Sequence, residues 1–291
     1  MLDNFLGGNY MKTKKIAYGV GLALMFCFAG SQAYAFQAEA GLQNDSTDLG
    51  SNDDLKVTSV GGTYYLQPVD ASGPQREAAF LAKASGVNAH YGTVDATVAS
   101  TGFDGSAYGV GVDYLLPMHD IKVGVDIQSY DVSASGTSIK SSMTTLGVGK
   151  YLDDRKYVAF KYGTGTDSIT GLPDTDNTDI NVNGKWLLDQ AGKTINLEGS
   201  IARASSDDGT TSGSNNIIKV GGDYYWDNSL SVGMGYSTNS GDNTSDEGST
   251  IDLQAEKFIN ENMSVAMLYS KFSADSASDE TTISFTFGGR F

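Results

Sequence analysis

The chain is built from short runs in which hydrophobic and polar positions alternate. Residues 281–291 read TTISFTFGGRF, with Ile283, Phe285, Phe287 and Phe291 on one set of alternate positions and mostly polar residues between them. Successive side chains of a β-strand point to opposite faces. The alternation therefore predicts a strand that separates two unlike environments.

The same pattern recurs along the whole chain, interrupted by polar turns rich in Gly, Ser, Asn and Asp. It predicts an all-β protein with about fourteen strands, and because strand boundaries slip by several residues, twelve or sixteen stay open. The strands are expected at 36–45, 55–67, 77–90, 106–116, 121–132, 138–152, 156–166, 179–188, 193–204, 215–226, 229–239, 250–259, 263–273 and 281–291.

Two lengths of connection alternate between these runs. Short turns are expected at 117–120, 153–156, 189–193, 227–229 and 260–262, and longer polar loops at 46–54, 92–105, 168–179, 205–214 and 240–249. Short turns on one side and long loops on the other are typical of a transmembrane antiparallel up-and-down β-barrel in the outer membrane of a Gram-negative bacterium. Aromatic residues near the short turns, such as Tyr64, Tyr224 and Trp226, predict a girdle at the membrane interface.

The N-terminal segment has the pattern of a secretory leader. Three lysines precede an apolar run in residues 11–35, which ends in Ala33-Tyr34-Ala35. This predicts a signal peptide over residues 1–35, with a non-native start at 1–10, followed by one barrel domain at 36–291. The only cysteine, Cys27, lies in the leader, so we expect no disulfide in the exported chain.

Charge narrows the range of partners. The formal net charge of −16 disfavours nucleic acid as a partner, because the phosphate backbone would repel the chain. For a barrel of this class we expect contacts with outer-membrane lipid and lipopolysaccharide, with the barrel-assembly machinery, and with small ions and solutes. A homo-oligomer stays open. We expect Phe291, an aromatic last residue on an alternating strand, to act as the assembly signal.

The most specific string is YYLQPVDASGPQREAAFLAKASGVNAHYG at 64–92. It resembles the putative general porin family of gammaproteobacterial outer membranes, and the matching residues are Tyr64, Tyr65, Pro74, Glu77, Ala78, Ala79, Phe80 and Leu81. The resemblance implies a diffusion pore and supplies neither an established solute nor catalytic residues. We interpret the neighbouring Arg76 and Glu77 as a solvated charge pair in a turn.

The chain has only two histidines, so few catalytic sites that use a histidine base are possible. His119 stands beside Asp120 in a short turn, and His90 lies within a few residues of Ser85 and Asp95. A catalytic dyad or triad needs its members within hydrogen-bond distance, and nothing in the sequence fixes that geometry. We therefore expect no enzyme activity, and an outer-membrane hydrolase stays a distant alternative.

One loop carries a candidate cation site. Asp174, Asp176, Asn177 and Asp179 offer oxygen ligands at a spacing that could suit Ca²⁺, but the loop lacks the glycine and the distal glutamate of a helix-flanked calcium loop. The alternative is a hydrated acidic loop, and we expect no metal and no cofactor.

Charged residues on the polar face of the strands should point into the barrel, because they would be costly against hydrocarbon. The predicted pore-lining residues are Glu39, Lys83, Asp113, Lys122, Asp126, Lys161, Lys185, Glu198, Lys219, Asp223, Asp252, Glu256 and Arg290. Lys56 also falls on this face, although the two faces of its strand are ambiguous.

These charges admit two functions. Fourteen strands should leave a narrow pore, which predicts an outer-membrane porin that passes ions and small hydrophilic solutes. The alternative is a structural or adhesive barrel whose lumen is closed by salt-bridged side chains. Carboxylates in the external loops predict weak cation selectivity, and these are Asp45, Asp48, Asp53, Asp54, Asp174, Asp176, Asp179, Asp207, Asp208, Asp242, Asp246 and Glu247.

Overall fold

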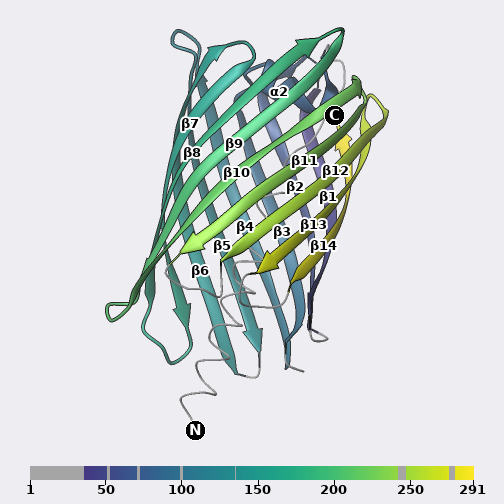
Figure 1. Cartoon of the computed structure of the whole chain (residues 1–291). Coiled ribbons are helices and arrows are strands. Elements are labelled where there is room, and N and C mark those ends of the chain that lie inside the picture. The colour runs from purple at the N-terminus through teal and green to yellow at the C-terminus, as the bar shows by residue number, and fades with distance from the viewer. Residues whose placement is uncertain are drawn as a thin grey trace.

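The computed structural model describes residues 36–50, 53–70, 73–98, 101–134, 136–241, 247–274 and 279–291, and in these ranges fourteen antiparallel strands close into one barrel (Figure 1). This confirms the predicted fold and strand number. The strands are β1 (Phe36–Gly50), β2 (Asp53–Val69), β3 (Gly86–Val98), β4 (Thr101–Leu116), β5 (Ile121–Ala134), β6 (Thr137–Asp153), β7 (Lys156–Ile169), β8 (Thr175–Gln190), β9 (Lys193–Asp207), β10 (Ser212–Asp227), β11 (Leu230–Gly241), β12 (Gly248–Asn260), β13 (Met263–Ala274) and β14 (Glu280–Arg290). The predicted leader at 1–35 lies outside the described residues.

The first and last strands close the barrel. β1 and β14 pair from Glu39 opposite Arg290 to Asp48 opposite Thr281. The final residue extends this pairing, because the Phe291 N–H donates to the Ala38 carbonyl at 2.8 Å and the Ala38 N–H donates back at 3.0 Å. Closure satisfies the backbone groups of both edge strands, as a lipid environment requires.

The outer surface carries an apolar band with aromatic residues at two levels. Val110 and Val112 on β4 are about half exposed, as expected for side chains that face lipid. Near the short turns the exposed tyrosines and tryptophans are Tyr64, Tyr114, Trp186, Tyr224 and Trp226, and farther along the strands they are Tyr91, Tyr108, Tyr162 and Tyr236. The exposed phenylalanines are Phe160, Phe285, Phe287 and Phe291. This arrangement matches the two interfacial girdles of outer-membrane barrels.

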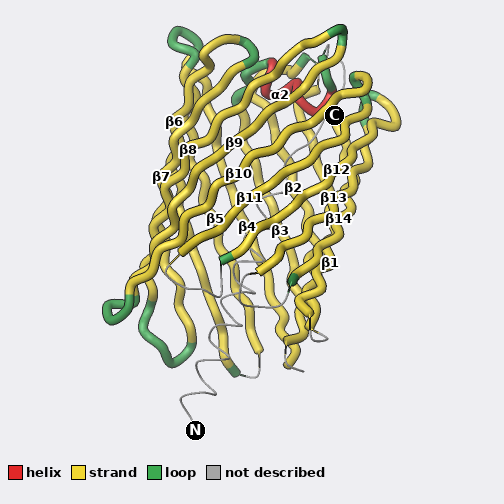
Figure 2. The backbone as a smooth tube through the Cα atoms, viewed as in Figure 1, coloured by secondary structure: helices red, strands yellow, loops and turns green. Residues whose placement is uncertain are grey.

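The short turns lie at the end of the barrel that also holds the C-terminus (Figure 2). At the other end the connections are shorter than predicted. β7 and β8 extend through most of the predicted loop 168–179, and only residues 99–100 separate β3 from β4. Runs rich in Ser, Thr and Asp read as loops in the sequence, yet their backbones pair here, because strand propensity depends strongly on context.

The connection between β2 and β3 differs most from expectation. Instead of a strand from residue 77, the chain forms a 3₁₀ turn η1 (Gln75–Glu77) and a short helix α2 (Ala78–Leu81), and β3 begins only at Gly86. The Ala-Ala-Phe-Leu-Ala run favours helix, and Lys83 follows with a φ of +49°. Among the described residues, no helix is long and apolar enough to cross a membrane.

Candidate functional site

The inner face of the barrel gathers the charged side chains. All of the predicted pore-lining residues except Lys83 lie on the inward-facing positions of their strands, opposite the exposed apolar residues. Asp45, Asp167 and Asp179 also face inward, and the sequence analysis placed the first and last of them in external loops. The alternation through Asp179, Asn181, Asn183 and Lys185 could have revealed Asp179. The inner face is therefore more acidic than predicted.

Two lysines lie elsewhere than predicted. Lys56 shares the outward face of β2 with Val60, and its Nζ lies 3.5 Å from Asp54 Oδ2 near the external end. Lys83 lies in the β2–β3 connection, with its Nζ 2.8 Å from Asp120 Oδ1 and 3.1 Å from Asp154 Oδ1 in two short turns. The hydrogen bond to Asp120 raises the pKa of Lys83 above its ordinary value.

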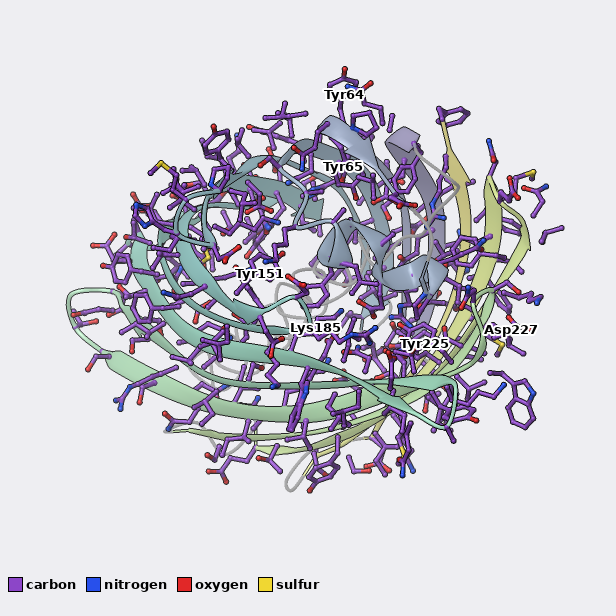
Figure 3. All side chains as sticks on the ribbon, turned by 90° about the horizontal axis from the view of Figure 1, so that it is seen from above. Tyr64, Tyr65, Tyr151, Lys185, Tyr225 and Asp227 are labelled. Atoms are coloured by element: carbon purple, nitrogen blue, oxygen red, sulfur yellow. The ribbon has the colours of Figure 1, made fainter. Side chains whose placement is uncertain are left out.

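Residues 73–85, which we call the periplasmic plug, fold into the barrel mouth on the side of the short turns. Figure 3, seen from above, shows the helical segment within the ring of strands, with Lys185 and Tyr225 beside it. The plug is the middle part of the string at 64–92 that resembles the porin family, so this part encodes a folded element instead of an extended turn.

Arg76 fixes one side of the plug to the barrel wall. Its Nη1 lies 2.9 Å from Asp223 Oδ1 on β10, and its Nε lies 3.7 Å from Glu256 Oε2 on β12. Its Nη2 donates to Gln254 Oε1 at 3.1 Å. The interpretation of Arg76 as a solvated turn residue is therefore wrong, because its charge is held by carboxylates more than a hundred positions away.

Glu77 is also buried, with 2% of its side chain exposed. Its Oε2 lies 2.6 Å from Lys185 Nζ on β8, and Tyr225 Oη donates to its Oε1 at 2.5 Å. Lys185 in turn lies 2.8 Å from Glu198 Oε1 on β9. A buried carboxylate is tolerated when it is paired and hydrogen-bonded in this way.

Further contacts hold the rest of the plug. The Phe80 ring packs against Tyr151 at a centroid distance of 5.4 Å and against Tyr157 at 6.4 Å. Arg290 Nη2 donates to the Gln75 carbonyl at 3.3 Å. The plug thus touches β6, β7, β8, β10, β12 and β14, and it crosses much of the mouth.

The residues considered for catalysis do not converge. His90 faces inward on β3, whereas Asp95 lies on the outward face of the same strand. Ser85 Oγ accepts a hydrogen bond from the Leu115 N–H at 2.8 Å. No Ser-His-Asp arrangement can form from these positions. His119 lies in the β4–β5 turn beside Asp120, whose carboxylate pairs with Lys83.

The candidate calcium ligands are also separated. Asp176 faces outward on β8, Asp179 faces inward, and Asp174 lies in the preceding turn. Within the described ranges, no group of three or more His, Cys, Asp or Glu side chains is placed to hold a metal ion.

The external carboxylates form a less regular ring than predicted. Asp45 is buried inside the barrel, Asp48 and Asp54 lie on the outer face of β1 and β2, and only Asp208 among the pair 207–208 lies in a turn. Asp242 and Asp246 lie outside the described residues.

Comparison with known proteins supports the architecture. A family model described as "Putative general bacterial porin" matches residues 13–290. The crystal structure of the Acinetobacter baumannii outer membrane protein Omp33 is similar, with 22% identity and a TM-score of 0.61 over 89% of this chain and 100% of that one. A TodX deletion mutant, described as a monoaromatic hydrocarbon channel, has 7% identity and a TM-score of 0.54 over 90% of this chain and 91% of that one.

No curated protein matches the chain in sequence. The structural neighbours share its barrel fold, and the family match covers nearly the whole chain. The barrel is that of a porin of the Gram-negative outer membrane, and the chain belongs to the putative general bacterial porin family.

Proposed function

We propose that this porin is a passive, weakly cation-selective channel for ions and small hydrophilic solutes. The observation that carries the proposal is the charged inner face, which holds more carboxylates than basic groups and keeps part of them accessible to water. Asp113 and Glu198 are half exposed although both face inward, and the inward-facing Lys161 on β7 is also exposed. Accessible inward charges are a property of a hydrated lumen.

The size of the barrel supports a narrow passage. Barrels of about eight strands fill their interior with side chains, whereas barrels of sixteen to eighteen leave a wide aqueous channel. Fourteen strands lie between these limits. A lumen with excess negative charge concentrates cations and repels anions, so the expected preference is for K⁺ over Cl⁻.

A closed structural barrel is the second candidate, and the periplasmic plug favours it. The plug is fixed by buried ion pairs to β8, β10 and β12, so it narrows the mouth in the state described here. The two candidates differ in whether ions pass the plug.

Planar bilayer recordings under a KCl gradient test the proposal. The expected result is a small ohmic conductance with a reversal potential of the sign for cation preference, weakening as ionic strength rises and screening shortens the reach of the carboxylates. An anion preference would contradict the selectivity. A barrel that is folded by gel mobility but never conducts would favour the closed alternative.

A further inference from the structure

The inward-facing charges fall into two groups with different exposure. Those near the plug are almost completely buried, with 4% of the Asp223 side chain, 5% of Glu256 and 1% of Arg290 exposed. Those on the wall from β4 to β9 are accessible, with half of the Asp113 and Glu198 side chains exposed. Water therefore reaches the β4–β9 wall more than the wall that carries Asp223, Glu256 and Arg290, although Glu198 also pairs with Lys185 beside the plug.

Glycines on the accessible wall let charged side chains lie flat against it. A Cβ atom at Gly124 would stand 2.4 Å from Asp113 Oδ1, and one at Gly111 would stand 2.6 Å from Asp126 Oδ2. These carboxylates thus occupy space that any other residue at the two positions would fill. Glycine in a strand often marks such close approach. The effect is to keep charge on the wall without filling the lumen.

The two groups also differ in how their charge is compensated. Asp223 and Glu256 are both paired with Arg76, so this cation offsets part of their negative charge. Asp126 accepts a hydrogen bond from Gln128 Nε2 at 2.8 Å, and Asp179 faces the lumen on β8. Among the described residues, neither carboxylate makes a salt bridge to a lysine or arginine, although Lys161 on the neighbouring strand β7 lies close enough to Asp179 for their charges to attract.

We infer that ions follow the β4–β9 wall and that Asp126 and Asp179 on this wall set the cation preference. Asp223 and Glu256, by contrast, anchor the plug. The inference rests on the proposed channel function and locates its selectivity inside the lumen instead of at the external mouth.

The first test compares two pairs of carboxylates by reversal potential in planar bilayers. Asp126→Asn with Asp179→Asn should shift the reversal potential toward zero. The control pair, Asp176→Asn with Asp207→Asn, removes two carboxylates that oppose each other on the outer face of β8 and β9 near the external mouth. The control should keep the wild-type value. If the control pair shifts the potential and the lumen pair does not, the mouth sets the preference and the inference is wrong.

The second test does not depend on conduction. In a Cys27→Ser background the chain has no other cysteine, so single cysteines can be placed at Asn181 on β8 and at Ser264 on β13, both facing inward. A membrane-impermeant cationic thiosulfonate should label Asn181→Cys faster than Ser264→Cys, measured by mass shift on the folded barrel in detergent micelles. Equal or reversed rates would overturn the inferred path. If the cysteine variants label as expected but the wild-type barrel does not conduct, the proposed channel function would instead be refuted.

Discussion

Arg76 and Glu77 are adjacent in the sequence but bind different strands of the barrel. Arg76 Nη1 lies 2.9 Å from Asp223 Oδ1 on β10, whereas Glu77 Oε2 lies 2.6 Å from Lys185 Nζ on β8. Two opposite charges thus hold the plug at two points that the sheet keeps apart. Because both contacts are buried, losing Arg76 leaves Asp223 and Glu256 without this cation, and losing Lys185 leaves Glu77 without its cation.

Replacing Arg76 should release the plug. Arg76→Ala leaves Asp223 and Glu256 without their cation, at a cost of about 3–5 kcal/mol for a buried pair broken on one side. We expect a larger single-channel conductance, because the loosened plug obstructs the mouth less. The strands keep their hydrogen bonds, so the unboiled protein should still migrate as a folded barrel in SDS gels.

Arg76→Lys serves as the matched control, because it keeps the charge but not the fork of the guanidinium group, and it should fall between wild type and Arg76→Ala. Unchanged conductance in Arg76→Ala would show that the plug does not obstruct the pathway.

Alkaline pH should weaken the anchor between Lys83 and the two short turns. The Asp120 hydrogen bond raises the pKa of Lys83 above 10.5, so the stabilisation is fully present below about pH 10.5 and is lost as pH rises through the raised pKa. We expect the conductance to change as pH rises through the raised pKa of Lys83. This change should be absent in the Lys83→Met variant. If Lys83→Met shows the same conductance change at alkaline pH, the change arises from another titratable group.

Filling a glycine on the accessible wall should narrow the passage. In Gly124→Val the new Cβ would displace the Asp113 carboxylate, which stands 2.4 Å from that position, toward the lumen. The displaced atom belongs to the end of a side chain, so the barrel should fold and the conductance should fall. Gly102→Ala is the control, because a Cβ there meets no atom within 4 Å. Equal conductance in both variants would argue against a path along this wall.

The final residue should matter for assembly. Phe291 is 76% exposed on the outer face, and its backbone bonds to Gln37 and Ala38. Replacing it with Asp places a charge at the membrane interface, and deleting it also removes the last backbone hydrogen bonds between β14 and β1. We expect less protein in the outer-membrane fraction and less of the heat-modifiable form, with the deletion more severe. Phe291→Trp should assemble normally. Wild-type abundance of the Asp variant would show that Phe291 is not the assembly signal.

The strands and their faces could be predicted because the alternation that specifies them is local. In TTISFTFGGRF the position of each residue in the alternation indicates whether its side chain faces inward or outward. The pairing of β14 with β1 then follows from barrel closure. The loop lengths could not be predicted, because polar residues such as those at 175–179 form strands once a neighbouring strand is present.

The plug was missed for a related reason. The Ala-Ala-Phe-Leu-Ala run after Glu77 favours helix, but the groups that bury Arg76 and Glu77 lie on β8, β10 and β12. Nothing near residue 77 indicates that Lys185 or Asp223 will stand beside it. The plug also determines which inward-facing charges are buried and which are accessible. This distribution could therefore not be predicted from the alternation of the strands.

The pairing of β1 with β14 has a consequence for the order of folding. Each hairpin joins neighbours in the sequence and forms at low entropic cost, but closure brings together Glu39 and Arg290, near the two ends of the domain. The bond between Arg76 and Asp223 spans 147 positions and also needs β10 in place. The plug can therefore seat only late, when most of the wall already exists. A bound plug therefore shows that most of the barrel wall has already formed. A barrel arrested before the plug binds would have an unobstructed periplasmic mouth.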